Sequence, residues 1–275
     1  MTAGQEQSMS NPKMPFFAGK SDLAPIPVSL TLFGEKLLMH SKSAHHTYCL
    51  FKKRQIAFDM GFCSMEAVPC KHIFITHAHE DHSWGVMRHI QYRRLFNLPP
   101  AFYYVPKDVE IDFRNAIGAW FQLNGRSQEE IPPIIGLAFG KQVTLEKGAR
   151  VEAIQTHHRK ASIGFHLYLN RHSPDIPFLS YLGDHSVQTL LAYPELGKST
   201  ILNMELTFIE ESEIEKARQY GHMHLNDLLC LIPKNYFQND ILIAQHLSSR
   251  YTPGRVEKLL RSKMPAALLE KLIVI

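Results

Sequence analysis

Cysteine is scarce in this chain of 275 residues, and the four that it has are scattered: Cys49, Cys63, Cys70 and Cys230. Because no Cys-x-x-Cys pair is present, the sequence indicates neither a disulfide framework nor a cysteine zinc site. We expect reduced, mostly buried thiols. The hydrophobic fraction of 45% can cover a substantial core, so the fold should need no covalent cross-links.

A long apolar run is also lacking. The first residues hold no basic start followed by an apolar stretch of secretory length, and no later run reaches the length that spans a bilayer. From this we expect a soluble, cytoplasmic protein. The excess of positive charge is small: a formal net charge of +4 is compatible with an anionic substrate but identifies none.

The patterned segments predict one α/β domain over residues 26–275, preceded by a disordered, proline-containing tail over residues 1–25. Apolar or alternating segments predict strands at 29–34, 46–51, 54–61, 71–77, 102–106, 149–158, 163–170, 178–184, 199–206 and 240–246. Helix-like windows lie at 83–96, 108–123, 211–232 and 254–270. No linker, repeat or low-complexity run divides these segments.

Histidine is abundant, with sixteen residues, and several follow a predicted strand directly. His77 ends one strand segment, His157 and His158 end another, Asp184 ends a third and His246 a fourth. Rigid strand ends can hold side chains in fixed geometry, so this placement is typical of an active site. We expect other histidines to be ordinary core or surface residues, among them His89, His166 and His172.

The densest cluster is H-x-H-x-D-H, formed by His77, His79, Asp81 and His82 in a loop between a predicted strand and a predicted helix. Imidazole and carboxylate are ligands that zinc accepts, and this spacing lets two pairs of side chains face two neighbouring ions. A single ion and a structural histidine cluster are the alternatives. A two-metal hydrolytic site also needs a bridging carboxylate and further histidines from elsewhere in the chain, and the sequence supplies both.

Together with the segment FDMG at 58–61 and the pattern downstream, this motif resembles the metallo-β-lactamase superfamily, which implies an αββα sandwich. Within the superfamily the chain is most similar to ribonuclease Z, the tRNA 3′-processing endonuclease, in its short form. The resemblance implies two divalent ions, expected to be Zn²⁺, with Mn²⁺ or Fe²⁺ as alternatives. One ion would be held by His77, His79 and His158, the other by Asp81, His82 and His246, and Asp184 would bridge them.

Two positions in this comparison stay open. His157 remains the alternative to His158 as the third histidine ligand. The family's usual Gly-Asp-Thr is Gly-Asp-His here, and we expect His185 to be an outward-facing neighbour and not a ligand.

The segment MELTFIEESEIEKARQYGHMHLNDLL resembles a part of ribonuclease Z that ordinary β-lactamases lack. Glu205 and Thr207 match its Glu-x-Thr element, and His222 follows Gly221 at the family's spacing. The resemblance implies that His222 donates a proton to the leaving group while Glu205 orients it, with Asp81 as a further catalytic residue. The implied substrate is RNA or a small phosphodiester, cleaved to a 3′-hydroxyl and a 5′-phosphate by metal-activated water. Ser248 and Arg250 would bind phosphate, and a homodimer is a further implication.

The resemblance has a gap. In ribonuclease Z an exosite arm that clamps the tRNA elbow is inserted before the Gly-Asp element, whereas here residues 166–182 suffice only for two strands and a turn. Arg88, Arg93 and Arg94 are basic candidates near the site, equally explicable as a solvated helix face. A small-molecule metallohydrolase, acting on a cyclic phosphodiester, lactone or thioester, is therefore the alternative. A nucleic-acid-binding module with structural metals ranks last.

Overall fold

The computed structural model describes residues 27–170 and 172–275, so the expected N-terminal tail lies outside the described residues. Two seven-stranded sheets are stacked face to face. The first comprises β1 (Val28–Leu32), β2 (Glu35–Lys42), β3 (His46–Phe51), β4 (Ile56–Phe58), β5 (His72–Phe74), β6 (Phe102–Pro106) and β7 (Ile134–Leu137). The second comprises β8 (Gln142–Thr144), β9 (Ala149–Gln155), β10 (Ile163–Leu169), β11 (Leu179–Tyr181), β12 (Ile201–Glu205), β13 (Ile241–Gln245) and β14 (Leu272–Val274).

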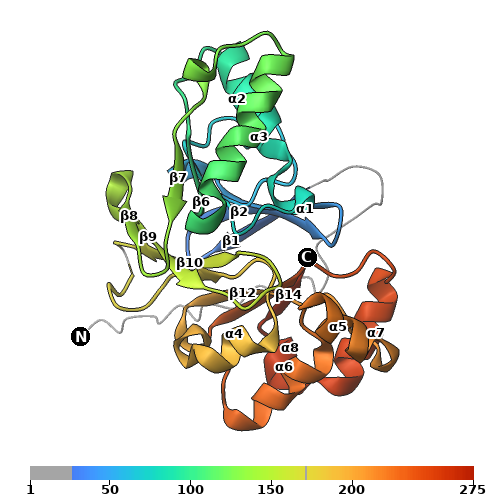
Figure 1. The fold of residues 1–275 in the computed structure, drawn as a ribbon. Helices are drawn as coiled ribbons and strands as arrows, with labels where there is room; N and C mark the ends of the chain where they lie inside the picture. Colours follow the sequence, from blue (N-terminus) through green and yellow to red (C-terminus); the bar gives the residue numbers. More distant parts are fainter. Residues whose placement is uncertain (1–26, 171) are drawn as a thin grey trace, which may run out of the picture.

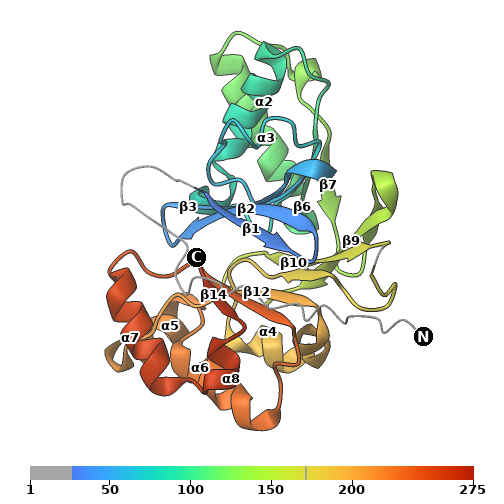
Figure 2. The same ribbon diagram turned by 180° about the vertical axis from the view of Figure 1, so that it is seen from behind.

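Helices cover the outer face of each sheet (Figure 1). The first sheet carries α1 (Glu80–Ser83), α2 (Gly85–Leu95) and α3 (Glu110–Leu123). The second carries α4 (Val187–Ala192), α5 (Ile214–Tyr220), α6 (Leu225–Leu231), α7 (Pro253–Lys263) and α8 (Ala266–Leu269). Seen from behind, the same four layers remain separate (Figure 2). The expected αββα sandwich is thus confirmed.

Both faces of the central strands are buried, which explains their almost unbroken apolar sequences. Successive residues of a strand point to opposite faces. On β13, Ile243 packs between the sheets, whereas Leu242 and Ala244 pack under the C-terminal helices. On the first sheet, Phe74 lies between the sheets and Ile73 packs under α2 and α3. Strands covered on both faces read as continuous apolar runs, which is the pattern that predicted them.

All ten predicted strands are present, and the described residues form four further strands that were not predicted: β2, β7, β8 and β14. β8 is a three-residue edge strand without a buried residue, so it gives no apolar pattern. The helical window at 211–232 is wrong as one unit. Gly221 ends α5 in a left-handed conformation (φ 74°), and the His224 side chain accepts a hydrogen bond from the Asn226 N–H at the start of α6.

The segment between the His157–His158 pair and Asp184 is as short as the sequence indicates. β10 and β11 pair antiparallel, with Phe165 opposite Tyr181 and Leu167 opposite Leu179, and residues 170–178 connect them. The thiols of Cys49, Cys63 and Cys70 are buried and free, as expected, but the free thiol of Cys230 is exposed. Within the described part of the chain, every helix is too short or too polar to cross a membrane.

Candidate metal centre

Ligand-type side chains gather where several strands of the two sheets end. β4 is followed by Asp59, β5 by His77, β11 by Asp184 and β13 by His246, and Glu205 is the last residue of β12. These strands are parallel to their neighbours, so their carboxyl ends reach the same edge of the sandwich. All five of these side chains are buried.

One group of ligand atoms comes from His77, His79, His158 and Asp184, which all lie within 4.8 Å of one another. The Nε2 atom of His77 is 2.9 Å from Nδ1 of His79 and 3.6 Å from the Asp184 carboxylate. Two ring nitrogens so close, each able to present a lone pair, favour a shared cation over mutual contact.

A second group comes from Asp81, His82 and His246. His246 Nε2 lies 3.1 Å from Asp81 Oδ2, which also accepts a hydrogen bond from the Ala44 backbone N–H at 2.8 Å. Asp184 Oδ1 is 3.1 Å from His82 Nε2 and 3.3 Å from His246 Nε2, whereas its Oδ2 faces His77. The two oxygens of Asp184 therefore face different groups, which is the arrangement a bridging carboxylate needs.

Hydrogen bonds behind the first two histidines fix which ring nitrogen is free. Thr76 donates its hydroxyl proton to Asp59 at 2.9 Å, so its oxygen accepts from Nδ1 of His77 at 3.0 Å. Asp59 also accepts from Nδ1 of His82 at 2.8 Å and from the Tyr181 hydroxyl at 3.0 Å. Both imidazoles thus turn Nε2 toward the centre, which is the atom that a metal-binding histidine presents when its Nδ1–H is held by a hydrogen bond.

Two more of the five candidate histidines, His158 and His246, are oriented in the same way. The His158 Nδ1 atom donates to the Gly221 carbonyl at 3.2 Å. Thr207 donates to Glu205, so its oxygen accepts from Nδ1 of His246 at 3.1 Å. The backbone of Gly221 lies close to the Arg159 side chain, because a Cβ at position 221 would be only 2.9 Å from Cγ of Arg159.

Two of these positions carry backbone strain. Asp59 and His246 both adopt left-handed φ values, 54° and 63°, which cost on the order of 1–3 kcal/mol for residues other than glycine. A third left-handed residue, Gly183 (φ 61°), packs so tightly that a Cβ would lie 2.6 Å from the Thr76 hydroxyl. Strain concentrated beside one cluster is typical of a functional site.

Three buried atoms of the cluster have no hydrogen-bond partner among the described residues: Nε2 of His82, Nε2 of His158 and Oδ1 of Asp184. Unsatisfied buried polar atoms are costly, and all three aim at the place where the two groups meet. Imidazole and carboxylate are donors suited to zinc and similar ions. The residues present therefore fit a pair of divalent cations.

Electrostatics agree with this donor set. Burial is the largest effect on His77 and lowers its pKa well below the ordinary value, so its ring is neutral and able to ligate. Burial disfavours the ionised Asp184, but His246 and His82 outweigh it and hold its pKa well below the usual range. Burial also disfavours the His82 imidazolium, yet Asp184 and Asp59 raise its pKa well above 6.5. Cation binding must therefore displace a proton from His82.

His222 and Glu205 form a pair beside the two groups. Nδ1 of His222 lies 3.0 Å and 3.1 Å from the two oxygens of Glu205, and its ring stacks on His246 with centroids 5.5 Å apart. Burial lowers the pKa of His222, but the Glu205 carboxylate outweighs burial and raises it to about 9. Nδ1 of His222 is also 3.9 Å from Asp184, so His222, Asp184 and His246 form a third group of ligand-type atoms.

The two neighbours of the ligand candidates lie apart from these groups. His157 belongs to none of the three, and its backbone N–H donates to the Thr189 hydroxyl at 2.7 Å. The expectation that His185 faces outward is wrong, because its side chain is fully buried and its backbone N–H donates to Glu205 at 2.6 Å. His185 thus helps to hold the carboxylate that contacts His222.

The phosphate-binding candidates differ in exposure. Ser248 is buried and accepts a hydrogen bond from Nε of Arg250 at 3.2 Å. The exposed Arg250 also pairs with Glu213 at 3.3 Å. Arg93 is neither a basic site residue nor part of a solvated face: it is buried and donates to the carbonyl oxygens of Val68, Cys70 and Pro99.

Sequence reasoning did not assign Asp59, Thr76 and Tyr181 to the site. Asp59 stands in the segment FDMG, directly after β4, so the rule that ligand-type residues follow strands could have found it. Thr76 and Tyr181 are ordinary strand-end residues in the sequence. Only their contacts with Asp59 give them a role.

A family model described as the beta-lactamase superfamily domain matches residues 62–235. The Arabidopsis thaliana protein tRNase Z TRZ1 is 25% identical over 248 residues, which are 79% of this chain and 86% of that protein. The crystal structure of the human short-form tRNase Z superposes with a TM-score of 0.57 at 17% identity, covering 88% of this chain and 90% of that one. The metallo-beta-lactamase fold protein YhfI of Bacillus subtilis superposes with a TM-score of 0.60 at 14% identity, covering 94% and 93%.

Proposed function

The chain belongs to the metallo-β-lactamase superfamily, and from this premise we propose that it is a metal-dependent endoribonuclease of the ribonuclease Z type. Its reaction would hydrolyse a phosphodiester to a 3′-hydroxyl and a 5′-phosphate. One observation carries the proposal: the His222–Glu205 pair lies against the two groups of metal-ligand candidates, where a phosphodiesterase needs a proton donor.

The ligand assignment follows the two groups. His77, His79 and His158 would hold one ion, and Asp81, His82 and His246 the other, with Asp184 between them. Two divalent ions would supply an activated water for attack on phosphorus and would stabilise the charge that develops on the phosphoryl oxygens.

His222 would deliver the proton. Its Nδ1–H is committed to Glu205, so Nε2 is the atom left to protonate the departing ribose 3′-oxygen, which is a poor leaving group when unprotonated. The raised pKa, about 9 before cations are considered, keeps the ring charged. Neighbouring cations oppose a positive charge on His222 and would lower this pKa toward neutrality, where a general acid works best.

Glu205 would position two groups at once. It accepts from His222, from the Thr207 hydroxyl and from the His185 backbone N–H. Through Thr207 it also fixes the tautomer of His246. Proton donor and metal ligand therefore share one buried carboxylate, so both are held in a fixed mutual geometry.

Ser248 and Arg250 would bind the phosphate. The Arg250 guanidinium already pairs with Glu213, so a bound phosphate would share or replace that partner. Asp81, whose Oδ2 faces His246 inside the cluster, would act as a ligand and so as a further catalytic residue.

The short turn between β10 and β11 favours the second candidate function, hydrolysis of a small molecule such as a cyclic phosphodiester, lactone or thioester. Long RNA draws affinity from many phosphate contacts, and a chain without an arm at this turn offers fewer of them. The superfamily relationship is common to both candidates. Substrate assays are needed to separate them.

The test combines metal analysis with three substrates: a pre-tRNA, a short single-stranded RNA with the same junction, and bis-p-nitrophenyl phosphate. The endoribonuclease proposal expects about two bound transition-metal ions and RNA products ending in 3′-hydroxyl and 5′-phosphate. Products with a 2′,3′-cyclic phosphate, or turnover of lactones or thioesters without any RNA cleavage, would contradict it. A His82→Ala variant serves as the metal-site control and should lose all three activities together.

A further inference from the structure

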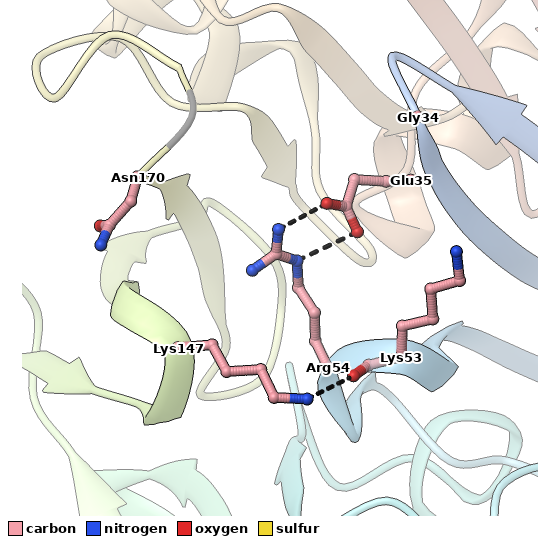
Figure 3. A pocket seen from close by; sticks show the side chains of 6 residues that line it. All are labelled: Gly34, Glu35, Lys53, Arg54, Lys147 and Asn170. Carbon is pink, nitrogen blue, oxygen red and sulfur yellow. Dashed lines mark hydrogen bonds and ion pairs between the residues drawn. The ribbon is translucent and has the colours of Figure 1, made fainter.

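A basic pocket of about 340 Å³ lies on the described surface apart from the metal-ligand cluster (Figure 3). Its lining comes from three segments: Gly34 and Glu35 where β2 begins, Lys53 and Arg54 on the 3₁₀ helix Lys52–Arg54, and Lys147 on the 3₁₀ helix Glu146–Gly148. Asn170, which directly follows β10, completes it. Pockets of this size are large enough to hold nucleotide-sized groups.

The pocket's charges favour an anion. Three of its four charged lining residues are cations, and the fourth, Glu35, pairs with Arg54 through two contacts of 3.0 Å and 2.5 Å. Among the described residues Lys53 makes no ion pair, and Lys147 only donates to the Lys53 carbonyl at 3.3 Å. The Nη1 nitrogen of Arg54 takes no part in the pair and points toward the Asn170 side of the pocket (Figure 3).

The pocket's wall depends on a specific backbone geometry. Lys147 and Gly148 are both left-handed, with φ of 57° and 70°, so the chain turns back sharply and places the Lys147 side chain over the pocket. A Cβ at position 148 would lie 1.7 Å from the Asn170 amide nitrogen. Gly148 and the Asn170 side chain therefore lie against each other beside the pocket. Arg54, only 13% exposed in its side chain, is held by Glu35.

The pocket lies at the opposite end of the strands from the metal-ligand cluster. β9 begins at Ala149, next to the pocket, and runs seven residues toward His158. β10 returns from Ile163, on the cluster side, to Leu169, next to Asn170. Seven strand residues span about 20 Å, at roughly 3.3 Å per residue. Roughly six nucleotides span that distance at the about 3.4 Å per step of a B-form duplex, and an A-form RNA duplex, which rises less per step, needs slightly more.

We propose that this pocket binds a backbone phosphate of an RNA substrate about six or more nucleotides away from the cleaved bond. The inference rests on the proposed endoribonuclease function. The pocket borders the short β10–β11 turn, and the phosphate candidates assigned near the cluster are Ser248 and the Glu213-paired Arg250. Lys53, Lys147 and the free edge of Arg54 would supply a remote contact that raises affinity for long RNA without touching the reacting atoms.

The test uses the double variant Lys53→Gln/Lys147→Gln on the full chain. Its matched control is Lys198→Gln/Lys234→Gln, which removes two exposed lysines from the helical layer of the second sheet. Binding of a long RNA, of at least fifteen nucleotides beyond the junction, is measured against salt concentration by fluorescence anisotropy. A short RNA of three nucleotides on each side and bis-p-nitrophenyl phosphate report on the cluster itself.

We expect the pocket variant to bind long RNA about tenfold more weakly, as for loss of a charge-assisted contact. The slope of log K against log salt should fall by about one. Short RNA and the model diester should be unaffected, the control should match the wild type, and Lys53→Arg/Lys147→Arg should restore long-RNA binding. An equal loss in the control, an equal loss with short RNA, or no loss at all would overturn the proposal.

Two further outcomes separate this inference from the proposed function. If the wild type binds long RNA through the pocket but cleaves no RNA, the pocket stands and the endoribonuclease proposal fails. If RNA is cleaved and the pocket variant binds long RNA as the wild type does, the endoribonuclease proposal stands and the pocket proposal fails. Titration with pyrophosphate alone tests whether the pocket's ligand is a small free anion. If pyrophosphate binding depends on Lys53 and Lys147 while the pocket variant binds long RNA as tightly as the wild type, the RNA assignment is overturned.

Discussion

Replacing His222 with alanine should slow cleavage of substrates with alkoxide leaving groups far more than cleavage of those with aryl leaving groups. In the structure His222 is oriented by Glu205 and leaves Nε2 free, so its proposed task is to protonate the departing oxygen. A nitrophenolate departs without that help. The variant should retain its metal ions, because the seven proposed ligands all belong to the first two groups and His222 is not one of them.

The magnitude can be worked from the pair. A pKa of about 9 against the ordinary 6.5 corresponds to on the order of 3 kcal/mol of preference for the charged ring. That preference keeps the ring in its proton-donating form at neutral pH. General acid catalysis contributes about 10²–10⁴-fold, or roughly 2.7–5.4 kcal/mol of barrier. We therefore expect His222→Ala to lose about 10²–10⁴-fold in kcat on alkyl diesters and less than about tenfold on aryl diesters.

The assay compares kcat for a methyl p-nitrophenyl diester series and a short RNA, with metal content measured on the same samples. Glu205→Gln should move the basic limb of the pH–rate profile to lower pH, because burial of His222 remains while its stabilising carboxylate is gone. His157→Ala, a histidine outside all three ligand groups, is the matched control and should leave the alkyl-to-aryl ratio unchanged. Equal losses on alkyl and aryl substrates, or a metal-depleted His222→Ala protein, would refute the general-acid assignment.

Three other predictions concern the metals, the pH dependence of stability and the substrate. Asp184→Ala should lose much of the bound metal together with activity, because one carboxylate faces both ligand groups, and a variant with full metal content and turnover would contradict the bridging role. In metal-free protein the His222–Glu205 pair should stabilise the fold by on the order of 3 kcal/mol below about pH 6.5, and this contribution should disappear as the pH rises through about 9. Urea denaturation in chelator should therefore show a difference in unfolding free energy between wild type and His222→Gln that shrinks over this pH range. A constant difference from pH 6 to 10 would count against the raised pKa. A pre-tRNA should be cleaved with little preference over a short single-stranded RNA carrying the same junction, and with a shallow salt dependence, because the connection between β10 and β11 is too short for an exosite arm. A kcat/KM for pre-tRNA more than about 10² times that for the short RNA, or roughly 2.7 kcal/mol, would show that the missing arm does not matter.

The ligand candidates were accessible from the sequence because their signals are local. H-x-H-x-D-H places four ligand-type residues in six positions. Asp184 comes three residues after one apolar strand, and His246 follows another directly. The carboxyl ends of neighbouring parallel strands meet at one edge of a sheet, so residues that follow different strands converge without any need for long-range information. The αββα architecture could likewise be predicted, because strands buried on both faces read as continuous apolar runs.

Other features depend on contacts between residues far apart in the chain. His157 and His158 are adjacent and chemically identical, and only the Gly221 carbonyl, 63 residues away, orients His158 toward the cluster. Arg93 has the sequence of a surface arginine, but the fold buries it among carbonyl groups that the chain leaves unpaired. His185 comes after the end of a predicted strand, so the sequence predicted an outward-facing side chain, whereas the fold buries it completely.

The sequence by itself therefore determined the fold and most of the ligand candidates, since apolar strands and the residues that follow them are local properties of the chain. The tertiary structure alone decided how those residues are held. Asp59, Thr76 and Thr207 set the ring tautomers, and Glu205 couples His222 to His246. Hydrogen bonds of this kind need atoms within about 3 Å of each other, and separations in sequence do not encode such distances before the sheets are stacked.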